Sequence, residues 1–264
     1  MAGSADSMDD SPLLRLPPEI REQIFKYALG GNVIHFAFSS RATDVYPRAF
    51  LCQAAHVLPR GRNESMLIAS HSDSDLGHKN CDPPGVVAHR MSLELLRSCR
   101  QINKEAGLLP FSENTFLFSD DVPFGVLARL LAGLNSHQAG AIRNLAIVCM
   151  YPIRSRHRPE WPSTAEVDFI VQTLHGLKDL QYVVELARQT HGKNYIGESL
   201  SRRQGLAEGI LMFRNIQLRS FEVRFCYIPR IASGAGYRVA ELEAFGRALE
   251  EDIIKQMTVE RGPT

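Results

Sequence analysis

The chain lacks a charge imbalance, a long apolar run and an obvious targeting segment. Its 30 basic and 29 acidic side chains leave a net charge of +1, which argues against the strongly basic surface of a dedicated nucleic-acid binder. No apolar run approaches the roughly 20 residues of a membrane span. The first residues, MAGSADSMDDS, have neither the basic nor the apolar region of a secretory signal. We therefore expect a cytoplasmic or nuclear protein.

Cysteine is scarce, and no C-x-x-C pair occurs among the five. Such a set, without a signal, predicts reduced thiols. Two short pairs, Cys52 with His56 and His78 with Cys81, contain residue types that bind zinc. The two pairs differ in order and spacing, and single Cys and His residues are common in loops. We therefore predict no metal site.

Recognisable catalytic motifs are also missing. The chain contains no G-x-S-x-G, H-E-x-x-H or G-x-x-x-x-G-K-[ST] sequence. Gly234 and Gly236 precede an expected helix, but Val239 stands where a dinucleotide loop needs its third glycine. We predict no cofactor and favour a protein that is not an enzyme. An enzyme without a recognisable motif remains an alternative, because pockets at the carboxyl ends of parallel strands are common.

Residues 13–29, LLRLPPEIREQIFKYAL, predict an amphipathic helix. Two prolines fit its first turn, where backbone amides have no partner within the helix. Gly30 and Gly31 predict its end. One side is apolar through Ile20, Ile24 and Phe25, and charged residues occupy the other side.

The rest of the first half predicts short elements around a long insertion. We expect a disordered tail over residues 1–11, a region over 12–120 and a second region over 121–264, with the two regions packed as one unit. The insertion, about residues 39–89, is rich in polar residues, proline and glycine. The other expected elements are a strand at 32–38, a helix at 92–106 capped by Ser92, a strand at 114–118 and a helix through Phe124 and Leu134.

Three segments of the second half share one pattern of apolar, basic, small polar and apolar residues. They are IRNLAI from Ile142, LKDLQY from Leu177 and LRSFEV from Leu218. Each follows an expected helix, at 124–134, 163–176 and 198–212, and a last helix is expected at 237–257. Units of this kind pair by crossovers into a parallel sheet, so we predict an α/β fold. The sheet is either leucine-rich-repeat-like or open and mostly parallel.

The strands of these segments should supply the core. Apolar residues alternate along each strand, so one face is expected to point at the helices. The residues on that face are predicted to include Leu145, Ile147, Leu180, Tyr182, Val184, Phe221, Val223 and Phe225.

The loop YPIRSRHRPEWP is basic and holds the single tryptophan. A cluster of this kind can bind an anionic partner through Arg154, Arg156, Arg158 and Trp161. The other interpretation is a solvated connector whose tryptophan caps the neighbouring helix.

The helix at 16–29 resembles the first helix of the F-box, whose usual form is L-P-x-E-[IL]-x-x-x-I-[FL]-x-[YH]-L. The matching residues are Leu16, Pro17, Glu19, Ile20, Ile24, Phe25 and Tyr27. LLRSCRQINKEA at 95–106 is similar to the second half of an F-box, although residues 30–94 separate the two halves. The layout is also similar to a large group of filamentous-fungal proteins with the pattern LPPEIR, then LLxxCRQIxxEA, then NTF.

The resemblance implies a non-enzymatic protein-interaction module, an F-box-type substrate adaptor of a ubiquitin ligase. Its repeat region would then bind a target protein. The implied docking residues are Leu16, Pro17, Pro18, Ile20, Ile24 and Phe25. The alternative is a single fused α/β domain with a fungus-specific regulatory or scaffolding role, in which the first helix is core and no ligase docks.

Residues 70–85 carry too few apolar side chains to offset the entropy lost on ordering. Limited proteolysis should therefore cut there first, and the two fragments should stay associated because the halves of the F-box-like region pack together. Added zinc should leave the cutting pattern unchanged. Protection by zinc that a chelator reverses would contradict this prediction and establish a metal site at the two Cys–His pairs.

Overall fold

The structure is a computed structural model that describes residues 11–37, 48–51, 91–120, 123–151, 163–187, 213, 216–228, 251 and 255. The predicted tail, most of the insertion, the predicted protease-sensitive stretch and the helix expected at 198–212 lie outside these residues. Of the last expected helix, Glu251 and Lys255 are described, and both are helical.

A six-stranded sheet in the order β2-β1-β3-β4-β5-β6 forms the centre of the protein. The strands are β1 (Val33–Ala37), β2 (Arg48–Leu51), β3 (Thr115–Asp120), β4 (Asn144–Tyr151), β5 (Asp179–Ala187) and β6 (Ser220–Ile228). β2 runs antiparallel to β1, and all the other neighbouring strands are parallel. The predicted α/β fold with a mostly parallel sheet is confirmed.

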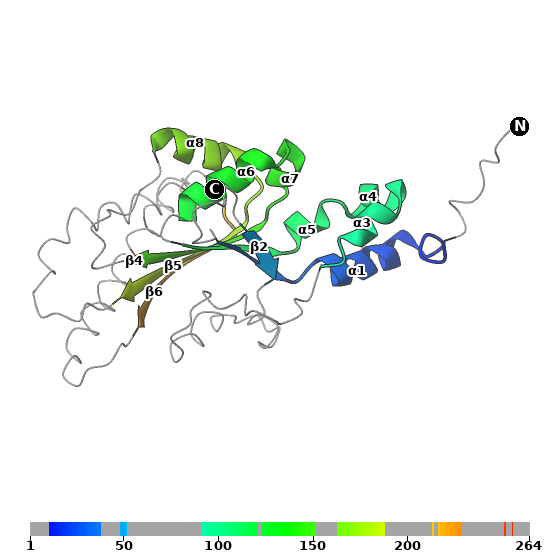
Figure 1. Ribbon diagram of the computed structural model, residues 1–264, viewed down its shortest axis with the longest axis horizontal. Coiled ribbons are helices and arrows are strands. Elements are labelled where there is room, and N and C mark those ends of the chain that lie inside the picture. Colours follow the sequence, from blue (N-terminus) through cyan, green and yellow to red (C-terminus); the bar gives the residue numbers. More distant parts are fainter. Residues whose placement is uncertain are drawn as a thin grey trace, which may run out of the picture.

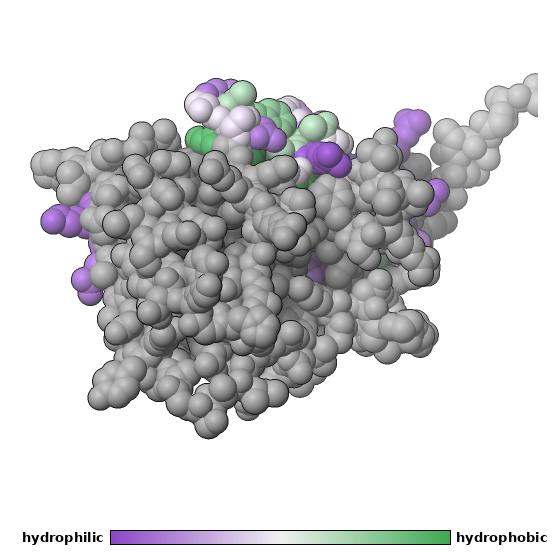
Figure 2. All heavy atoms as spheres, turned by 60° about the vertical axis from the view of Figure 1, so that its left-hand side comes forward, coloured by the Kyte–Doolittle hydropathy of each residue, from purple (hydrophilic) through white to green (hydrophobic). Residues whose placement is uncertain are grey.

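Three helices, α6 (Pro123–Gly133), α7 (Ser136–Gly140) and α8 (Thr164–Thr173), lie together on one side of the sheet (Figure 1). The parallel strands follow one another in chain order, so crossovers of one hand bring their helices to the same face. Figure 2 shows this helical layer at the top of the molecule, with apolar and polar side chains mixed on its outer surface. Phe169 of α8 is 39% exposed there.

The three repeated segments occupy equivalent positions in neighbouring strands. Leu145 pairs with Leu180, which pairs with Phe221. Two positions further along, Ile147 pairs with Tyr182. Side chains alternate between the faces of a strand, so this register places all the repeated apolar residues on one face. The three copies of the pattern therefore lie side by side in the sheet, in the same register.

The main core lies between this face and the helices. Leu145, Ile147, Leu180 and Tyr182 are each at most 1% exposed, as predicted, and Phe221 is partly buried against them. The side chains of Val184, Val223 and Phe225 lie outside the described residues. The helices contribute buried apolar residues of their own: Phe124, Leu127, Leu131, Ile170 and Leu174.

Four further helices form a group beside the amino-terminal ends of the parallel strands (Figure 1). They are α1 (Pro18–Leu29), α3 (Glu94–Ser98), α4 (Arg100–Ala106) and α5 (Leu109–Ser112). The group has a small core of its own, formed by Phe25, Leu29, Ile102 and Ala106. The helix predicted from the proline pair to the glycine pair is confirmed as α1.

The expectation of a single helix over residues 92–106 is wrong, because this segment forms two helices. Cys99 has extended backbone angles (φ −156°, ψ 162°), and it separates α3 from α4. Its sulfur accepts a hydrogen bond from the backbone amide of Ile102 and so caps α4, whereas Ser92 caps no helix. The sequence analysis also missed α5 and α7, because elements of four or five residues are too short to show a period.

The central strand register is testable through Leu180, which is fully buried on β5. Leu180→Ala removes buried methyl groups and leaves a cavity, so the free energy of unfolding should fall by about 2–5 kcal/mol. Chemical denaturation measures this change, and Gln181→Ala, at the next and only partly buried position, is the control. A nearly neutral result at Leu180 would show that the register is wrong.

Candidate functional site on the first helix

Helix α1 buries one side and exposes another apolar side. Phe25 and Leu29 are at most 1% exposed and pack against Ile102 and Ala106 of α4. Ile20, Ile24 and Tyr27 are 42%, 38% and 81% exposed. Successive helical residues are about 100° apart around the axis, so Ile24 and Phe25 point in clearly different directions. Phe25, which the sequence analysis placed among the docking residues, is thus a core residue of the helical group and lies off the exposed side of α1.

Ile20, Ile24 and Tyr27 lie on successive turns at spacings of four and three, so they are neighbours on the helix surface. We call these three residues the α1 stripe. At the start of the helix, Pro17 and Pro18 are exposed and Leu16 is partly buried. Five of the six predicted docking residues therefore keep exposed surface at or near the stripe, and Tyr27 is the exposed residue that the prediction left out.

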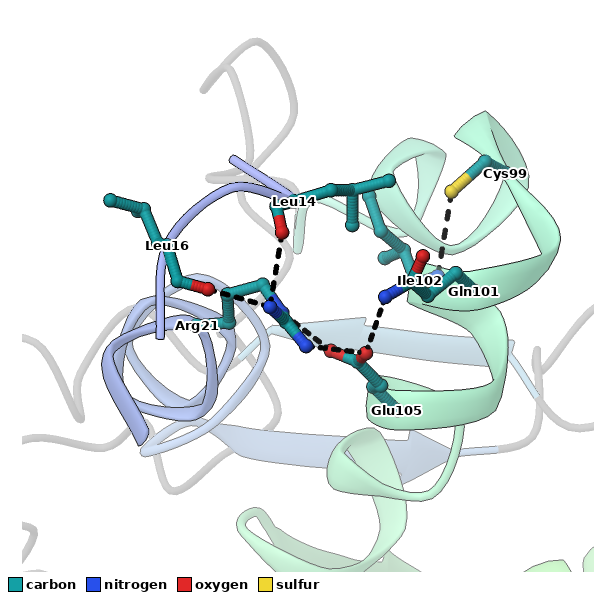
Figure 3. A network of polar contacts seen from close by, with 7 residues as sticks. All are labelled: Leu14, Leu16, Arg21, Cys99, Gln101, Ile102 and Glu105. Atoms are coloured by element: carbon teal, nitrogen blue, oxygen red, sulfur yellow. Dashed lines mark hydrogen bonds and ion pairs between the residues drawn. The ribbon is translucent and has the colours of Figure 1, made fainter. Parts of the chain in front are cut away.

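The buried side of α1 is held to α4 by an ion pair with two hydrogen bonds (Figure 3). Arg21 donates from Nε to Oε2 of Glu105 and from Nη2 to Oε1, both at 2.8 Å. Its Nη1 donates to the backbone carbonyls of Leu14 (3.1 Å) and Leu16 (2.6 Å). One guanidinium thus joins the turn before α1, α1 itself and α4.

The ion pair also changes the titration of both partners. The hydrogen bonds from Arg21 hold the pKa of the Glu105 carboxyl below its usual value of 4.5, and the amide of Gln101 adds to this by donating to Oε1 at 2.9 Å. The same hydrogen bonds raise the pKa of Arg21. Both groups are therefore charged at neutral pH, and the geometry is the bidentate one that favours arginine over lysine.

A second polar residue, Asn114, joins α1 to the sheet. Its side chain is 1% exposed. Nδ2 donates to the carbonyls of Leu29 (2.6 Å) and Pro110 (2.9 Å), and Oδ1 accepts from the amide of Asn32 (2.8 Å). The last carbonyls of a helix have no hydrogen-bond donor within the helix, and Asn114 supplies a donor for the carbonyl of Leu29.

Arg21, Glu105 and Asn114 come from the three motifs of the fungal pattern: LPPEIR, CRQIxxEA and NTF. Arg21 and Glu105 bond to each other near the start of α1, and Asn114 bonds to backbone groups at its end, so all three make contacts inside the protein. The sequence analysis missed this role of Arg21 and Glu105. The feature that could have indicated it is the position of Arg21, four residues before Phe25 and therefore on the same, buried side of the helix.

A polar cluster at the amino ends of β5 and β6 is also structural. Asp179 accepts hydrogen bonds from the guanidinium of Arg219 and from Oγ of Ser220, the latter at 2.8 Å. The hydrogen bonds to Asp179 raise the pKa of Arg219. These contacts join the neighbouring strands where they begin.

The predicted basic loop, with Arg154, Arg156, Arg158 and Trp161, lies outside the described residues, as do the two Cys–His pairs. Within the part of the chain that the structure describes, no three His, Cys, Asp or Glu side chains are placed to share a metal ion. None of the described helices is long and apolar enough to cross a membrane.

The fold and the site define an α/β protein whose first helix carries an exposed apolar stripe. Comparison with known families gives a match over residues 6–229 to the family described as Domain of unknown function (DUF7730), and the chain belongs to that family. The matched residues include the N-terminal helical group and all six strands. No curated protein and no solved structure gives a significant match.

The pair between Arg21 and Glu105 predicts an acid-sensitive contribution to stability. Folding lowers the pKa of Glu105. The contribution to stability is therefore complete at pH values above the unfolded pKa of 4.5, and it is lost as the pH falls through the lower pKa of the folded state. Arg21→Gln and Glu105→Gln should each lower the free energy of unfolding, with a positive coupling in a double-mutant cycle at about pH 7 that is smaller at an acidic pH below the usual glutamate pKa of 4.5. Urea denaturation at both pH values measures it.

The control is the pair between Glu22 and Lys26, also on α1, whose side chains are 60% and 44% exposed. Solvent screens such a pair, so its coupling should be much smaller. Equal coupling in the two cycles would show that the bidentate pair contributes no more than an ordinary surface pair.

Proposed function

We propose that the protein is a non-enzymatic protein-interaction module that docks a protein partner through the α1 stripe. In the most specific form of the proposal it is an F-box-type substrate adaptor, whose α1 binds the scaffold of a ubiquitin ligase. The observation that carries the proposal is the exposure of Ile20, Ile24 and Tyr27 on a helix whose buried side, with Phe25 and Leu29, packs against α4.

Physical arguments support a docking role for the stripe. Single apolar residues on a surface are common, but three on successive turns form a continuous contact area. Helices that bind in grooves use anchors at i, i+4 and i+7, and positions 20, 24 and 27 have this spacing. Burying apolar surface stabilises a complex by roughly 25 cal/mol per Å² before the costs of association.

The F-box resemblance supports the choice of partner. Leu16, Pro17, Ile20 and Ile24 match the F-box pattern and keep exposed surface. Phe25 also matches, but it packs inside the helical group. In the proposal, Tyr27 therefore takes part in docking and Phe25 supports the helix from behind.

A second candidate is a fused α/β protein with a regulatory or scaffolding role and no ligase docking. The contacts of Arg21 and Asn114 favour it, because they join α1 to distant segments of the same chain. The N-terminal helices then serve the fold, and the stripe binds a different protein or none. Binding of a ligase scaffold discriminates between the two candidates.

The basic loop provides a separate candidate surface for an anionic partner. By sequence it follows the carboxyl end of β4, the end of a parallel sheet at which ligands commonly bind. An enzymatic role at this end is the least favoured proposal, because the sequence offers no nucleophile paired with a base.

The docking proposal predicts that Ile24→Asp weakens binding to the purified ligase scaffold at least about tenfold, which corresponds to about 1.4 kcal/mol. A charge at this position would have to be desolvated in an apolar groove. Titration calorimetry measures the affinity, and thermal unfolding checks that the variant folds.

The matched control is Phe169→Asp on α8, because Phe169 is 39% exposed and Ile24 is 38% exposed. This variant should bind like the wild type. Failure of the wild-type protein to bind at micromolar concentration would eliminate ligase docking and leave the second candidate. Equal losses in both variants would show that the binding is not specific to the stripe.

A further inference from the structure

We propose that Asn114 is a positioning residue that holds the α1 stripe at one fixed orientation relative to the sheet. A partner docked on α1 is then presented at a constant angle to whatever the sheet region binds. The significance of this geometry rests on the proposed function, whereas the geometry itself is testable in the free protein.

The chain between α1 and the sheet is short. Gly30, Gly31 and Asn32 connect the end of α1 to the start of β1. Asn114 immediately precedes β3, which lies next to β1 in the sheet. The connection after α1 therefore meets the connection before β3, although the two segments are more than 80 residues apart in the sequence. We call this meeting point the joint between the helical group and the sheet.

The side chain of Asn114 bonds to backbone groups on both sides of this joint. Leu29 belongs to α1, Pro110 to α5, and Asn32 to the connection into β1. An asparagine amide donates two hydrogen bonds and accepts another through its oxygen, which matches this set of two carbonyls and one amide. An aspartate can only accept, so it would leave both carbonyls without their donor.

Backbone contacts bring the two segments together around Asn114. The amide of Gly31 donates to the carbonyl of Glu113 at 2.8 Å, and the amide of Thr115 donates to the carbonyl of Asn32 at 2.9 Å. Gly31 has φ 73°, a conformation that favours glycine. At Gly30, a Cβ atom would lie 2.6 Å from Cβ of Glu113, so the two segments leave no room for a side chain.

The helical core alone does not explain a fixed orientation. Phe25 and Leu29 hold α1 to α4, so the helical group coheres as a unit. The bonds of Asn114 join this unit, through Leu29, to Asn32 in the connection that leads into β1. Phe111 of α5 also stacks on Phe116 of β3, with ring centroids 6.2 Å apart, so loss of the Asn114 side chain should loosen the helical group against the sheet without detaching it.

The test measures the distance between two spin labels in the free, full-length protein. The labels are carried by ketone-bearing aromatic amino acids at Tyr27 on α1 and Phe169 on α8, both exposed positions, so the native cysteines stay in place. The wild type should give one narrow distance distribution. Asn114→Ala should broaden it about twofold, and amide exchange at residues 30–32 should accelerate at least about tenfold while α8 is unchanged.

Asn135→Ala is the matched control, because Asn135 is an exposed asparagine that caps α7 and bonds to Gln138. It should leave the distance distribution narrow. Gly30→Ala is a second variant and should also broaden the distribution, because its new Cβ presses against Glu113.

A broad distribution in the wild type overturns the proposal whatever the variants do. A narrow distribution in Asn114→Ala overturns it as well. Because no partner is present, either result is distinct from a failure of the docking proposal, which is measured by binding of the ligase scaffold.

Discussion

The ion pair between Arg21 and Glu105 is the contact on which the arrangement of the N-terminal half depends. Arg21 lies on the buried side of α1, with Phe25 and Leu29, and its pair with Glu105 joins that side to α4. A partly buried arginine needs a partner, and the carboxylate of α4 together with two backbone carbonyls satisfies four of its donor contacts. With this side committed to α4, the stripe of Ile20, Ile24 and Tyr27 is left facing outward.

The same contacts change how the motif pattern is understood. The motifs resemble a docking module, yet their polar residues Arg21, Glu105 and Asn114 make contacts within the chain. These contacts join α1 to segments that lie more than 80 residues further along the chain. The function we propose depends instead on apolar residues between them, which the fold leaves exposed.

Much of the sheet region was predictable because strand and helix patterns are local. The alternation around Leu145, Leu180 and Phe221 predicted which face of three strands is buried, and the helix expected at 163–176 is α8, which Ser163 caps. The break at Cys99 was not predictable in this way. The apolar spacing continues through it, and the break shows only in the structure, in the extended backbone of Cys99 and the contact of its sulfur with Ile102.

The sequence by itself determined the α/β class, the repeated helix-strand units and the amphipathic character of α1, since each depends on residues close together in the chain. It did not determine which apolar residues of α1 are free. Both Phe25 and Ile24 fit one apolar side, and they are distinguished by partners on α4 that lie far along the chain. Only the tertiary structure brings those partners to one side of the helix, and it thereby decides which surface remains for another protein.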